Sequence, residues 1–519
     1  MSNPQILWVD DEIERLQPHI IFLKQKGYEV TPVSNGFDAI HEAEQKLFDL
    51  VLLDEMMPGM DGLSVLTKLK ELYPEIPVVM ITKSEEETLM EEAIGHKITD
   101  YLTKPVNPSQ ILLACKKILK GTEIQKEKFS QAYHLEFSKI SYMLMEPLSH
   151  TQWIDLYKKI TDLELKVDAH SEMNLRQTLD DQRFESNIEF GKYIDKNYLS
   201  WINQEQEGPT LSPDVIKKWV KPQLENDEKT VFLLVDCLRY DQWLMMEEVL
   251  KDFFKVETDF HYSILPTATP YSRNAIFSGL YPSEIEKRYP DLWQTGDDDD
   301  NSRNRYEREL LEMHLQRLGL SNKKFGYEKI VNHDDSKRLE KNIGRLIDAN
   351  DLNAIVFNFV DILAHSRADS RVLKELAPNE AAYRSLTYSW FKHSPLYNVF
   401  KTMAEKKVKV VVTTDHGSIR VLHGTKVIGD RDTSTSLRYK YGRSLQANPK
   451  HAIYITQPEL WRLPRRGVNT TYILAKEDYY FVYPTNYHKY LNHYYDSFQH
   501  GGISLEEMVL PVVTLESKI

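Results

Sequence analysis

Short, nearly unbroken apolar runs, rich in β-branched residues, recur towards both ends of this chain and constrain its fold most strongly. Examples are Leu50–Leu53 near the N-terminus, and Val231–Val235 and Ala354–Val360, which is followed by Asp361, further on. A strand with one solvent-exposed face alternates apolar and polar side chains. A central parallel strand is covered on both faces and shows no such alternation. The runs therefore predict an α/β fold, with parallel sheets buried between helices in two separate parts of the chain.

The first part, about 1–121, contains five such runs with amphipathic segments between them. The runs are Ile6–Val9, Tyr28–Val33, Leu50–Leu53, Pro77–Ile81 and Ile98–Leu102. Strict alternation of strand and helix predicts one doubly wound N-terminal domain with a parallel sheet.

Length and composition fit a soluble protein of about three domains. The chain has 519 residues, and 65 Lys+Arg against 78 Asp+Glu give a net charge of −13. This balance disfavours a protein that coats nucleic acid, which needs a basic surface.

Two cysteines, Cys115 and Cys237, exclude a disulfide framework. No apolar stretch reaches the roughly 18 residues of a membrane span and the N-terminus is no signal peptide, so we expect a cytoplasmic protein without a membrane segment.

The middle of the chain, about 122–205, changes to helical periodicity. Only Pro147 and Gly191 interrupt it. We predict several helices here, and a helical linker domain is favoured over a specific binding module because the pattern alone carries no chemistry. Gly208-Pro209 then marks a boundary, after which the α/β pattern resumes, so a third domain is expected over 206–519.

Polar residues stand at the ends of the N-terminal strands. Asp10 and Asp11 follow the first run, Asp54 ends the third, Thr82 ends the fourth and Lys104 follows the fifth. Because the carboxyl ends of parallel strands meet at one edge of the sheet, these groups are expected to lie together. Three neighbouring carboxylates need a cation, and Mg²⁺ prefers oxygen ligands. The pattern predicts a magnesium site where a carboxylate attacks phosphorus.

These residues resemble the receiver domain of bacterial response regulators, across nearly all of the first domain. The matching segments are Val9–Glu12, Leu53–Gly62, Ile81-Thr82 and Tyr101–Pro105. The resemblance implies that a sensor histidine kinase phosphorylates Asp54. It implies that Mg²⁺ binds Asp10, Asp11, Asp54 and the backbone carbonyl of Met56, and that Thr82, Tyr101 and Lys104 are the switch residues. It also implies a homodimer on phosphorylation, through a surface spanning about 84–120.

A second set of metal-binding residue types follows the apolar runs of the C-terminal part. The set is Asp236, Asp361, His365, Asp415, His416 and His500. Nitrogen and oxygen ligands together favour Zn²⁺, with Mn²⁺ as the alternative. Three aspartates and one ionised hydroxyl would carry four negative charges, which two divalent cations balance. The segment Leu265–Pro270 supplies two candidate hydroxyls, Thr267 and Thr269. We therefore predict a two-metal site for phosphoryl transfer.

This set resembles the alkaline phosphatase superfamily, and most closely its PglZ branch, over about 223–519. The matching segments are Val235–Asp241, Pro266–Pro270, Ser278–Pro282 and His500–Met508. The resemblance implies that Thr269, rather than Thr267, is the nucleophile. It implies one Zn²⁺ on Asp236, Thr269, Asp415 and His416, and another on Asp361, His365 and His500. Arg239 and Arg273 are candidates for binding the substrate phosphate, with salt bridging at a helix start or the surface as the alternative.

Receiver, helical linker and PglZ domain in this order resemble the PorX-type response regulators, which are associated with type IX protein secretion. The resemblance implies a phosphorylation-controlled, zinc-dependent phosphodiesterase whose substrates are oligonucleotides. A metal-stabilised signalling scaffold that binds a sigma factor or another regulator stays open. So does a phosphomutase, although the spacing of the motifs leaves modest room for its lid. Direct DNA binding is disfavoured, because no helix-turn-helix pattern follows residue 121 and the chain is acidic.

Overall fold

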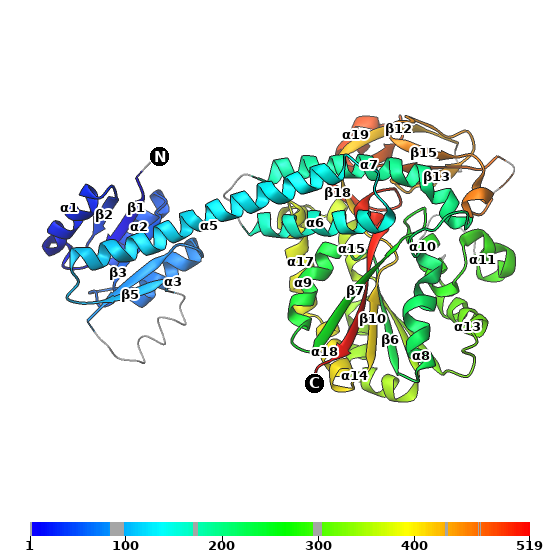
Figure 1. Cartoon of the computed structure of the whole chain (residues 1–519), viewed down its shortest axis with the longest axis horizontal. Helices are drawn as coiled ribbons and strands as arrows, with labels where there is room; N and C mark the ends of the chain where they lie inside the picture. Colours follow the sequence, from blue (N-terminus) through cyan, green and yellow to red (C-terminus); the bar gives the residue numbers. More distant parts are fainter. Residues whose placement is uncertain are drawn as a thin grey trace. The chain divides into compact units, whose positions relative to one another are not determined.

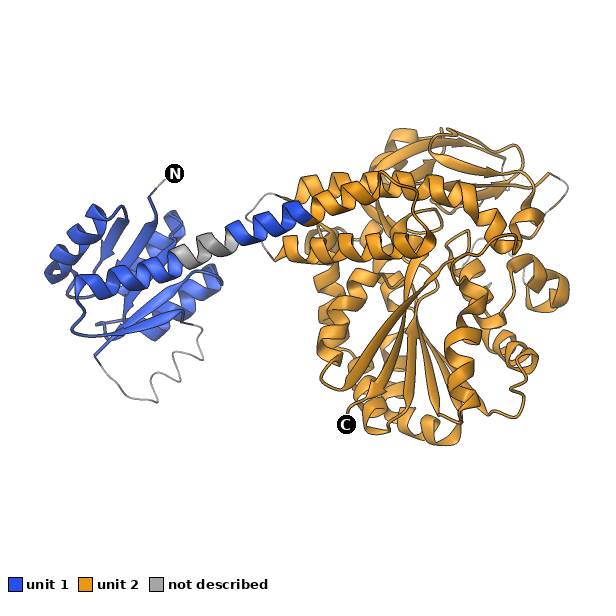
Figure 2. Ribbon diagram, viewed as in Figure 1, with its two compact units in different colours: residues 1–135 blue, residues 136–519 orange. Residues whose placement is uncertain are grey.

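The protein is seen here in a computed structural model, which describes residues 3–83, 98–169, 175–293, 304–430, 434–465, 467 and 469–519, without the side chains of 120–126. The chain divides into two compact units, residues 1–135 and 136–519 (Figure 2). Each unit contains its own main sheet.

The first unit is built on a five-stranded parallel sheet in the order β2-β1-β3-β4-β5. Each strand lies within two residues of its predicted run. The strands are β1 (Gln5–Val9), β2 (Glu29–Val33), β3 (Leu50–Asp54), β4 (Val78–Thr82) and β5 (Asp100–Thr103). The helices are α1 (Gln17–Gln25), α2 (Gly36–Gln45), α3 (Gly62–Leu72) and the first part of α5 (Pro108–Met143).

Alternate residues of β1 show why the sheet is covered on both faces. Ile6 and Trp8 pack in a core with side chains of α1 and α5, whereas Leu7 and Val9 pack in a second core with side chains of α2 and α3. Successive side chains of a strand point to opposite faces, so an unbroken apolar run serves two cores. The predicted doubly wound α/β fold is confirmed for this unit.

The second unit contains a six-stranded mixed sheet in the order β7-β19-β10-β6-β9-β8. The four strands from β10 to β8 are parallel, and β19 runs antiparallel to β10 and β7. Their bounds are β6 (Thr230–Val235), β7 (Phe254–Tyr262), β8 (Phe325–Ile330), β9 (Leu352–Phe357), β10 (Lys409–Thr413) and β19 (Val509–Ser517).

One predicted strand end was wrong. The run Ala354–Val360 was expected to be a strand ending at Asp361, but β9 ends at Phe357 and helix α15 (Phe359–Asp369) follows. The neighbouring strand β8 ends opposite, with Ile330 paired to Phe357, so no ladder remains to extend β9. Asp361 therefore lies in the first turn of a helix.

Helices cover the main sheet of the second unit on both sides, with α9, α17 and α18 opposite α10, α11 and α13 (Figure 1). The helices of this unit are α6 (His150–Asp168), α7 (Arg176–Ile202), α8 (Lys221–Glu225), α9 (Tyr240–Leu250), α10 (Thr269–Ser278), α11 (Pro282–Arg288), α13 (Glu307–Arg317), α14 (His333–Ala349), α15, α16 (Arg371–Leu376), α17 (Glu380–His393), α18 (Pro395–Glu405), α19 (Tyr487–Tyr494) and α20 (Leu505–Met508).

Three small sheets complete the second unit, at the top of Figure 1. Their orders are β11-β18, β14-β12-β17 and β13-β16-β15. The strands are β11 (Ile419–Val421), β12 (His423–Ile428), β13 (Tyr439–Gly442), β14 (Gln446–Ala447), β15 (Ala452–Ile455), β16 (Thr471–Ala475), β17 (Tyr479–Val482) and β18 (Ser497–Gln499). β18 matters most for function, because His500 follows it directly.

The predicted middle helices pack against the C-terminal α/β domain. Trp153 of α6 contacts Phe190 of α7, with 5.2 Å between ring centroids. Gly191 lets α7 approach the β16–β17 turn closely, since a Cβ there would lie 3.1 Å from Glu477 Oε1. The expected boundary near residue 121 falls inside α5, which runs to Met143.

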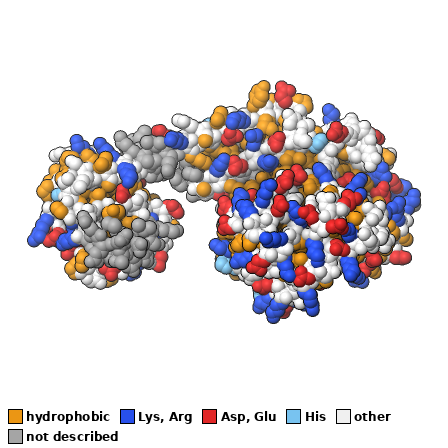
Figure 3. Space-filling view, turned by 60° about the horizontal axis from the view of Figure 1, so that its bottom comes forward, with side chains coloured by type: hydrophobic (Ala, Val, Ile, Leu, Met, Phe, Trp, Pro, Cys, Tyr) orange, Lys and Arg blue, Asp and Glu red, His pale blue; other side chains and the backbone are white. Residues whose placement is uncertain are grey.

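The surface of the second unit carries charges of both signs. On the face shown in Figure 3, basic and acidic side chains are interspersed over the second unit. Within the described residues, no helix is long and apolar enough to cross a membrane.

Candidate active site

The receiver residues meet at the carboxyl edge of the first sheet. Asp10, Asp11 and Asp54 each place one carboxylate oxygen within 4.8 Å of the others. Lys104 Nζ lies 2.9 Å from Asp10 Oδ2 and 3.0 Å from Asp54 Oδ1. Burial raises the pKa of Asp54 to about 6, although Lys104 acts against that shift. A buried carboxylate with this charge around it suits both a cation and a phosphoryl group.

The other predicted receiver residues surround this cluster. The Thr82 hydroxyl donates a hydrogen bond to Glu55. The Tyr101 side chain is exposed. A cavity of about 550 Å³ beside the cluster is lined by Asp11 and Met56, among others. The Met56 side chain is exposed.

A first cluster of potential zinc ligands is buried in the second unit. Asp236 follows β6, and Asp415 and His416 follow β10, where they place ligand atoms within 4.8 Å of one another. Thr269, the first residue of α10, has its Oγ1 3.0 Å from His416 Nε2. All four are at most 6% exposed. The structure thus brings these four predicted residues together.

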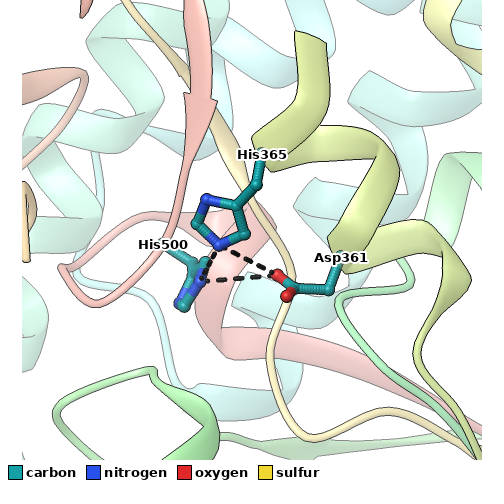
Figure 4. A group of neighbouring side chains, drawn as sticks. All are labelled: Asp361, His365 and His500. Carbon is teal, nitrogen blue, oxygen red and sulfur yellow. Dashed lines mark hydrogen bonds and ion pairs between the residues drawn. The ribbon is translucent and has the colours of Figure 1, made fainter. Parts of the chain in front are cut away.

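A second cluster lies beside the first. Asp361 and His365, one turn apart on α15, converge with His500 (Figure 4). His365 Nε2 lies 3.2 Å from His500 Nε2, and Asp361 Oδ1 lies 3.4 Å and 3.5 Å from these two nitrogens. The rings of His500 and His416 stack with centroids 4.1 Å apart, so the two clusters form one continuous site.

These distances fit a tetrahedral cation. Zinc ligands at 2.0–2.2 Å in tetrahedral geometry lie about 3.3 Å apart, close to the three separations in the second cluster. In addition, Asp236 Oδ1, Asp361 Oδ1 and Asp415 Oδ1 are buried and accept no hydrogen bond from any residue that the structure describes. Buried carboxylate oxygens are rarely left without a partner. The residues present therefore fit two divalent cations.

The pKa shifts follow from burial and from the neighbouring charges. Burial raises the pKa of Asp236 well above its ordinary value. Burial and His500 lower the pKa of His416 to about 4, which leaves its ring neutral near pH 7. Burial would raise the pKa of Asp361 too, but His365 and His500 hold it below the ordinary range. Neutral imidazoles and ionised carboxylates are the forms that bind zinc, so His416 and Asp361 are in the binding form, whereas Asp236 would release its proton when a cation binds.

The two arginines proposed for substrate are both ion-paired inside the protein. Arg273 is fully buried and binds Asp415 through Nε at 2.9 Å, and it also pairs with Asp236. It thus adjoins the first cluster and holds the carboxylates that face it. Arg239 is 1% exposed and pairs with Asp241 and Glu380. For Arg239, this placement matches the alternative of salt bridging at a helix start.

The sequence patterns did not reveal several groups around the nucleophile. Asn304 donates to the Thr269 backbone carbonyl at 3.2 Å, and Glu307 lies 3.5 Å from Arg273 Nη1. Asn304 lies 35 residues after Thr269 in the sequence, and no spacing rule connects either residue to Thr269. By contrast, Thr267 is explained by its contacts, because its hydroxyl donates to the Gly502 carbonyl at 2.8 Å.

A cavity of about 260 Å³ opens beside the second cluster. His365 and His500 form part of its wall, together with Tyr439, Tyr494, His493 and Gln499. Aromatic rings and amides are suited to contact a planar heterocycle, so this cavity offers room for a substrate next to the candidate metal ligands.

Comparison with known proteins covers all three parts of the chain. Family models match residues 6–116 (response regulator receiver domain), 123–202 (PorX response regulator linker domain) and 215–515 (BREX system PglZ alkaline phosphatase-like domain). A relative, transcriptional regulatory protein SrrA of Staphylococcus aureus, is 33% identical over 152 residues, which are 29% of this chain and 61% of that protein. The chain therefore spans less than two thirds of the relative's length.

Solved receiver domains match the N-terminal part. The CheY-like receiver domain protein of Methanospirillum hungatei is 29% identical, covering 24% of this chain and 99% of its own, with a TM-score of 0.23. Chemotaxis protein CheY4 of Vibrio cholerae is 28% identical, covering 23% of this chain and 100% of its own, with a TM-score of 0.22.

The PglZ model spans more than half of the chain and includes both candidate metal clusters. The receiver and linker models precede it in the predicted order. The chain belongs to the PglZ alkaline phosphatase-like family and, with its receiver and PorX linker, is a PorX-type response regulator.

Proposed function

We propose that this response regulator is a two-zinc phosphodiesterase that hydrolyses oligonucleotides and is controlled by phosphorylation of Asp54. By resemblance to the PorX-type regulators, we further propose that it acts in the cytoplasm to regulate type IX protein secretion. A receiver domain implies a cognate histidine kinase, which would supply the phosphoryl group.

The observation that carries this proposal is the position of the Thr269 hydroxyl beside two contiguous ligand clusters. One cation would be held by Asp236, Thr269, Asp415 and His416, and the other by Asp361, His365 and His500. When bound, such a pair lowers the pKa of the hydroxyl and stabilises the charge of a phosphoryl group in transfer. The separation of 3.0 Å between Thr269 Oγ1 and His416 Nε2 suits two ligands of one cation.

The protein's own groups then account for a two-step displacement. Thr269 Oγ, after losing its proton to solvent, attacks phosphorus, so that a bond from Oγ to phosphorus forms and the bond to the leaving nucleoside oxygen breaks, and that oxygen takes up a proton from solvent. A water molecule then gives a proton to solvent and attacks phosphorus, which breaks the bond to Thr269 Oγ and releases the phosphorylated product. Thr269 opens α10, so the positive end of that helix faces the transferred group. Arg273 keeps Asp236 and Asp415 oriented.

The Asp54 site supports the regulatory half of the proposal. Asp10, Asp11, Asp54 and the Met56 carbonyl would hold Mg²⁺, which neutralises the incoming phosphoryl group. Lys104 would bind a phosphoryl oxygen, because its ammonium already lies 3.0 Å from Asp54. Thr82 and Tyr101 would then change position, as switch residues do in receivers.

The decisive experiment compares two threonines of one segment. Thr269→Ala in the zinc-loaded protein should reduce hydrolysis of a model phosphodiester by at least about 1000-fold, because the attacking atom is removed. Thr267→Ala is the matched control, since its hydroxyl is bonded to the Gly501–Gly502 backbone, and it should retain activity within about tenfold. Cleavage at the parent rate by the Thr269→Ala protein would refute the mechanism.

The scaffold alternative makes the opposite prediction. If the metals only hold a surface for a sigma factor or another regulator, purified protein loaded with zinc shows no hydrolysis, and partner binding is unchanged in Thr269→Ala. Measuring both properties on the same preparations separates the two functions.

A further inference from the structure

A buried network of ion pairs connects the middle helices to the C-terminal α/β domain. Its three least exposed arginines are Arg183 of α7, Arg239 at the start of α9 and Arg384 of α17, and the more exposed Arg176 joins at the edge through Glu164 and Asp168. They share five carboxylates, Glu164, Asp168, Asp241, Glu380 and Glu506. Arginines in a dry interior must be paired, so such a network fixes the relative positions of the segments that contribute to it.

Arg183 is the member that joins the most distant segments. Its Nη1 lies 3.0 Å from Glu164 of α6, its Nη2 lies 3.0 Å from Glu380 of α17, and its Nε lies 2.6 Å from Glu506 of α20. The side chain is 12% exposed. A guanidinium presents its donors in a rigid fork, so these three carboxylates are held at set angles to one another.

Glu506 lies between Arg183 and the turns that carry the candidate zinc ligands. It lies six residues after His500, and its backbone oxygen would be 2.0 Å from a Cβ placed on Gly417, the residue after His416. The segment around Glu506 thus packs tightly against the turn that carries His416. A shift of the Glu506 backbone towards Gly417 would therefore push that turn.

A second residue of α7 holds the same segment. Asn187, one turn after Arg183, accepts a hydrogen bond from the Leu505 backbone N–H at 2.8 Å and donates to Glu506 Oε2 at 3.1 Å. Asn187 is 2% exposed. Two buried side chains on one face of α7 therefore fix the chain just after the His500 loop.

The other side of α7 contacts α5. Gln182, next to Arg183 and 2% exposed, donates from Nε2 to the Phe137 carbonyl and to Ser141 Oγ, both at 2.9 Å. Adjacent residues of α7 thus contact the end of α5 and the segment that follows the zinc ligands.

We propose that Arg183 is a positioning residue for the C-terminal zinc centre, acting through Glu506, so that the middle helices complete the metal site. This inference rests on the zinc site proposed above. Without Arg183, the buried Glu506 carboxylate must move towards water or take up a proton. The turns that carry His416 and His500 are then no longer held in their positions relative to each other.

The test titrates zinc alone into the metal-free, full-length chain. Arg183→Gln should weaken zinc binding by about tenfold, the lower end of what is seen when groups behind metal ligands are removed. Arg176→Gln is the matched control. Arg176 lies two turns earlier on α7, is 31% exposed and pairs with Glu164, Asp168 and Asp180 of the middle helices. The zinc affinity of the Arg176→Gln protein should stay within about twofold of that of the parent protein.

Steady-state kinetics provide a second measurement. At saturating zinc, Arg183→Gln should lower kcat for a small model phosphodiester and leave KM unchanged, because ligand geometry rather than substrate contact is altered. Arg183→Lys keeps the charge without the fork and should bind zinc with intermediate affinity; it also decides the case if Arg183→Gln does not fold.

Three outcomes are distinct. Equal zinc affinities for the Arg183 and Arg176 variants, at equal melting temperatures, would overturn the inference. Parent-like affinity of Arg183→Lys, if Arg183→Gln does not fold, would overturn it as well. Failure of the parent chain itself to bind zinc would refute the proposed function instead.

Discussion

Buried carboxylates in this chain fall into two kinds according to their partners. The pKa of Asp241 falls to about 2, because Arg239 and Arg384 outweigh the effect of burial. Asp54 and Asp236 are also buried, but burial prevails and their pKa values rise. A carboxylate whose negative charge is poorly compensated in a dry place suits a cation, as Asp54 and Asp236 do. Asp361, another candidate ligand, differs because its neighbouring histidines keep its pKa low.

Asp54 allows this distinction to be measured. Its folded pKa of about 6 exceeds the ordinary 3.8, so its ionisation destabilises the fold as pH rises from about 4 through 6. In magnesium-free buffer, Asp54→Asn should raise the melting temperature of the receiver at pH 8 and change it little near pH 4. Calorimetry of the full chain at both values measures this.

Asp61 is the matched control in the same domain. Its carboxylate accepts the Ser64 N–H at 2.7 Å as the cap of α3, which lowers its pKa. The stability that it contributes is present above its ordinary pKa of 3.8 and is lost as pH falls. Asp61→Asn should therefore lower the melting temperature at pH 8. The same sign for both variants would contradict the assignment.

At the scale of residues, the predicted ligands come together where local patterns carry the information. Ligands at strand ends, and the pair Asp361 and His365 one turn apart, follow from periodicity. The environment of Arg239 does not, because its partner Glu380 is remote in sequence and only the packing of α17 on α9 brings the two together. For the same reason no motif indicated Arg183.

At the scale of elements, the strands were predicted better than the turns that position the ligands. Unbroken apolar runs reveal buried strands whatever their neighbours are. The end of β9 was misplaced, because it depends on where β8 stops. The close approach of the Gly417 turn to α20 depends on chain segments about 90 residues apart. A single glycine in the sequence does not indicate such a contact.

Gly417 provides a prediction for this approach. A Cβ there would lie 2.0 Å from the Glu506 backbone oxygen, so Gly417→Ala must displace one of two buried segments. We expect a loss of about 1–3 kcal/mol in unfolding free energy and weaker zinc binding. Urea denaturation and metal analysis of the purified variant measure the two effects.

Gly344 on α14 is the control for the same substitution. An added Cβ would make ordinary contacts, the nearest at 3.6 Å from Lys406 Cε, within a helix. Gly344→Ala should stabilise the protein by about 0.5–1 kcal/mol and leave zinc binding unchanged. If Gly417→Ala were as stable as Gly344→Ala, the close packing at the His416 turn would be refuted.

At the scale of the whole molecule, the chain combines a receiver with an α/β unit that contains the candidate metal clusters, through helices that belong structurally to that unit. The order of domains was predictable, because each carries its own motifs. The packing of α6 and α7 on the second unit was not, since amphipathic helices do not specify which surface they cover.

Phosphorylation is expected to change the oligomeric state. Acetyl phosphate or fluoroberyllate with Mg²⁺ should convert monomers into homodimers, as measured by light scattering after size-exclusion chromatography. Asp54→Ala should remain unchanged, and an equal response would contradict the role of Asp54. Part of the expected dimer surface, residues 84–97, lies outside the described residues.

The two candidate zinc clusters differ in their access to solvent. The side chains of Asp236, Asp415 and His416 are at most 2% exposed, whereas His365 is 48% and Asp361 19% exposed. Ions in the outer cluster should therefore exchange with the surroundings much faster than ions in the inner one. Chelators would first yield a half-loaded protein that keeps its nucleophile's ion and its fold. The hydrolytic activity would then depend on the concentration of free zinc. Zinc depletion would therefore lower the activity independently of the kinase.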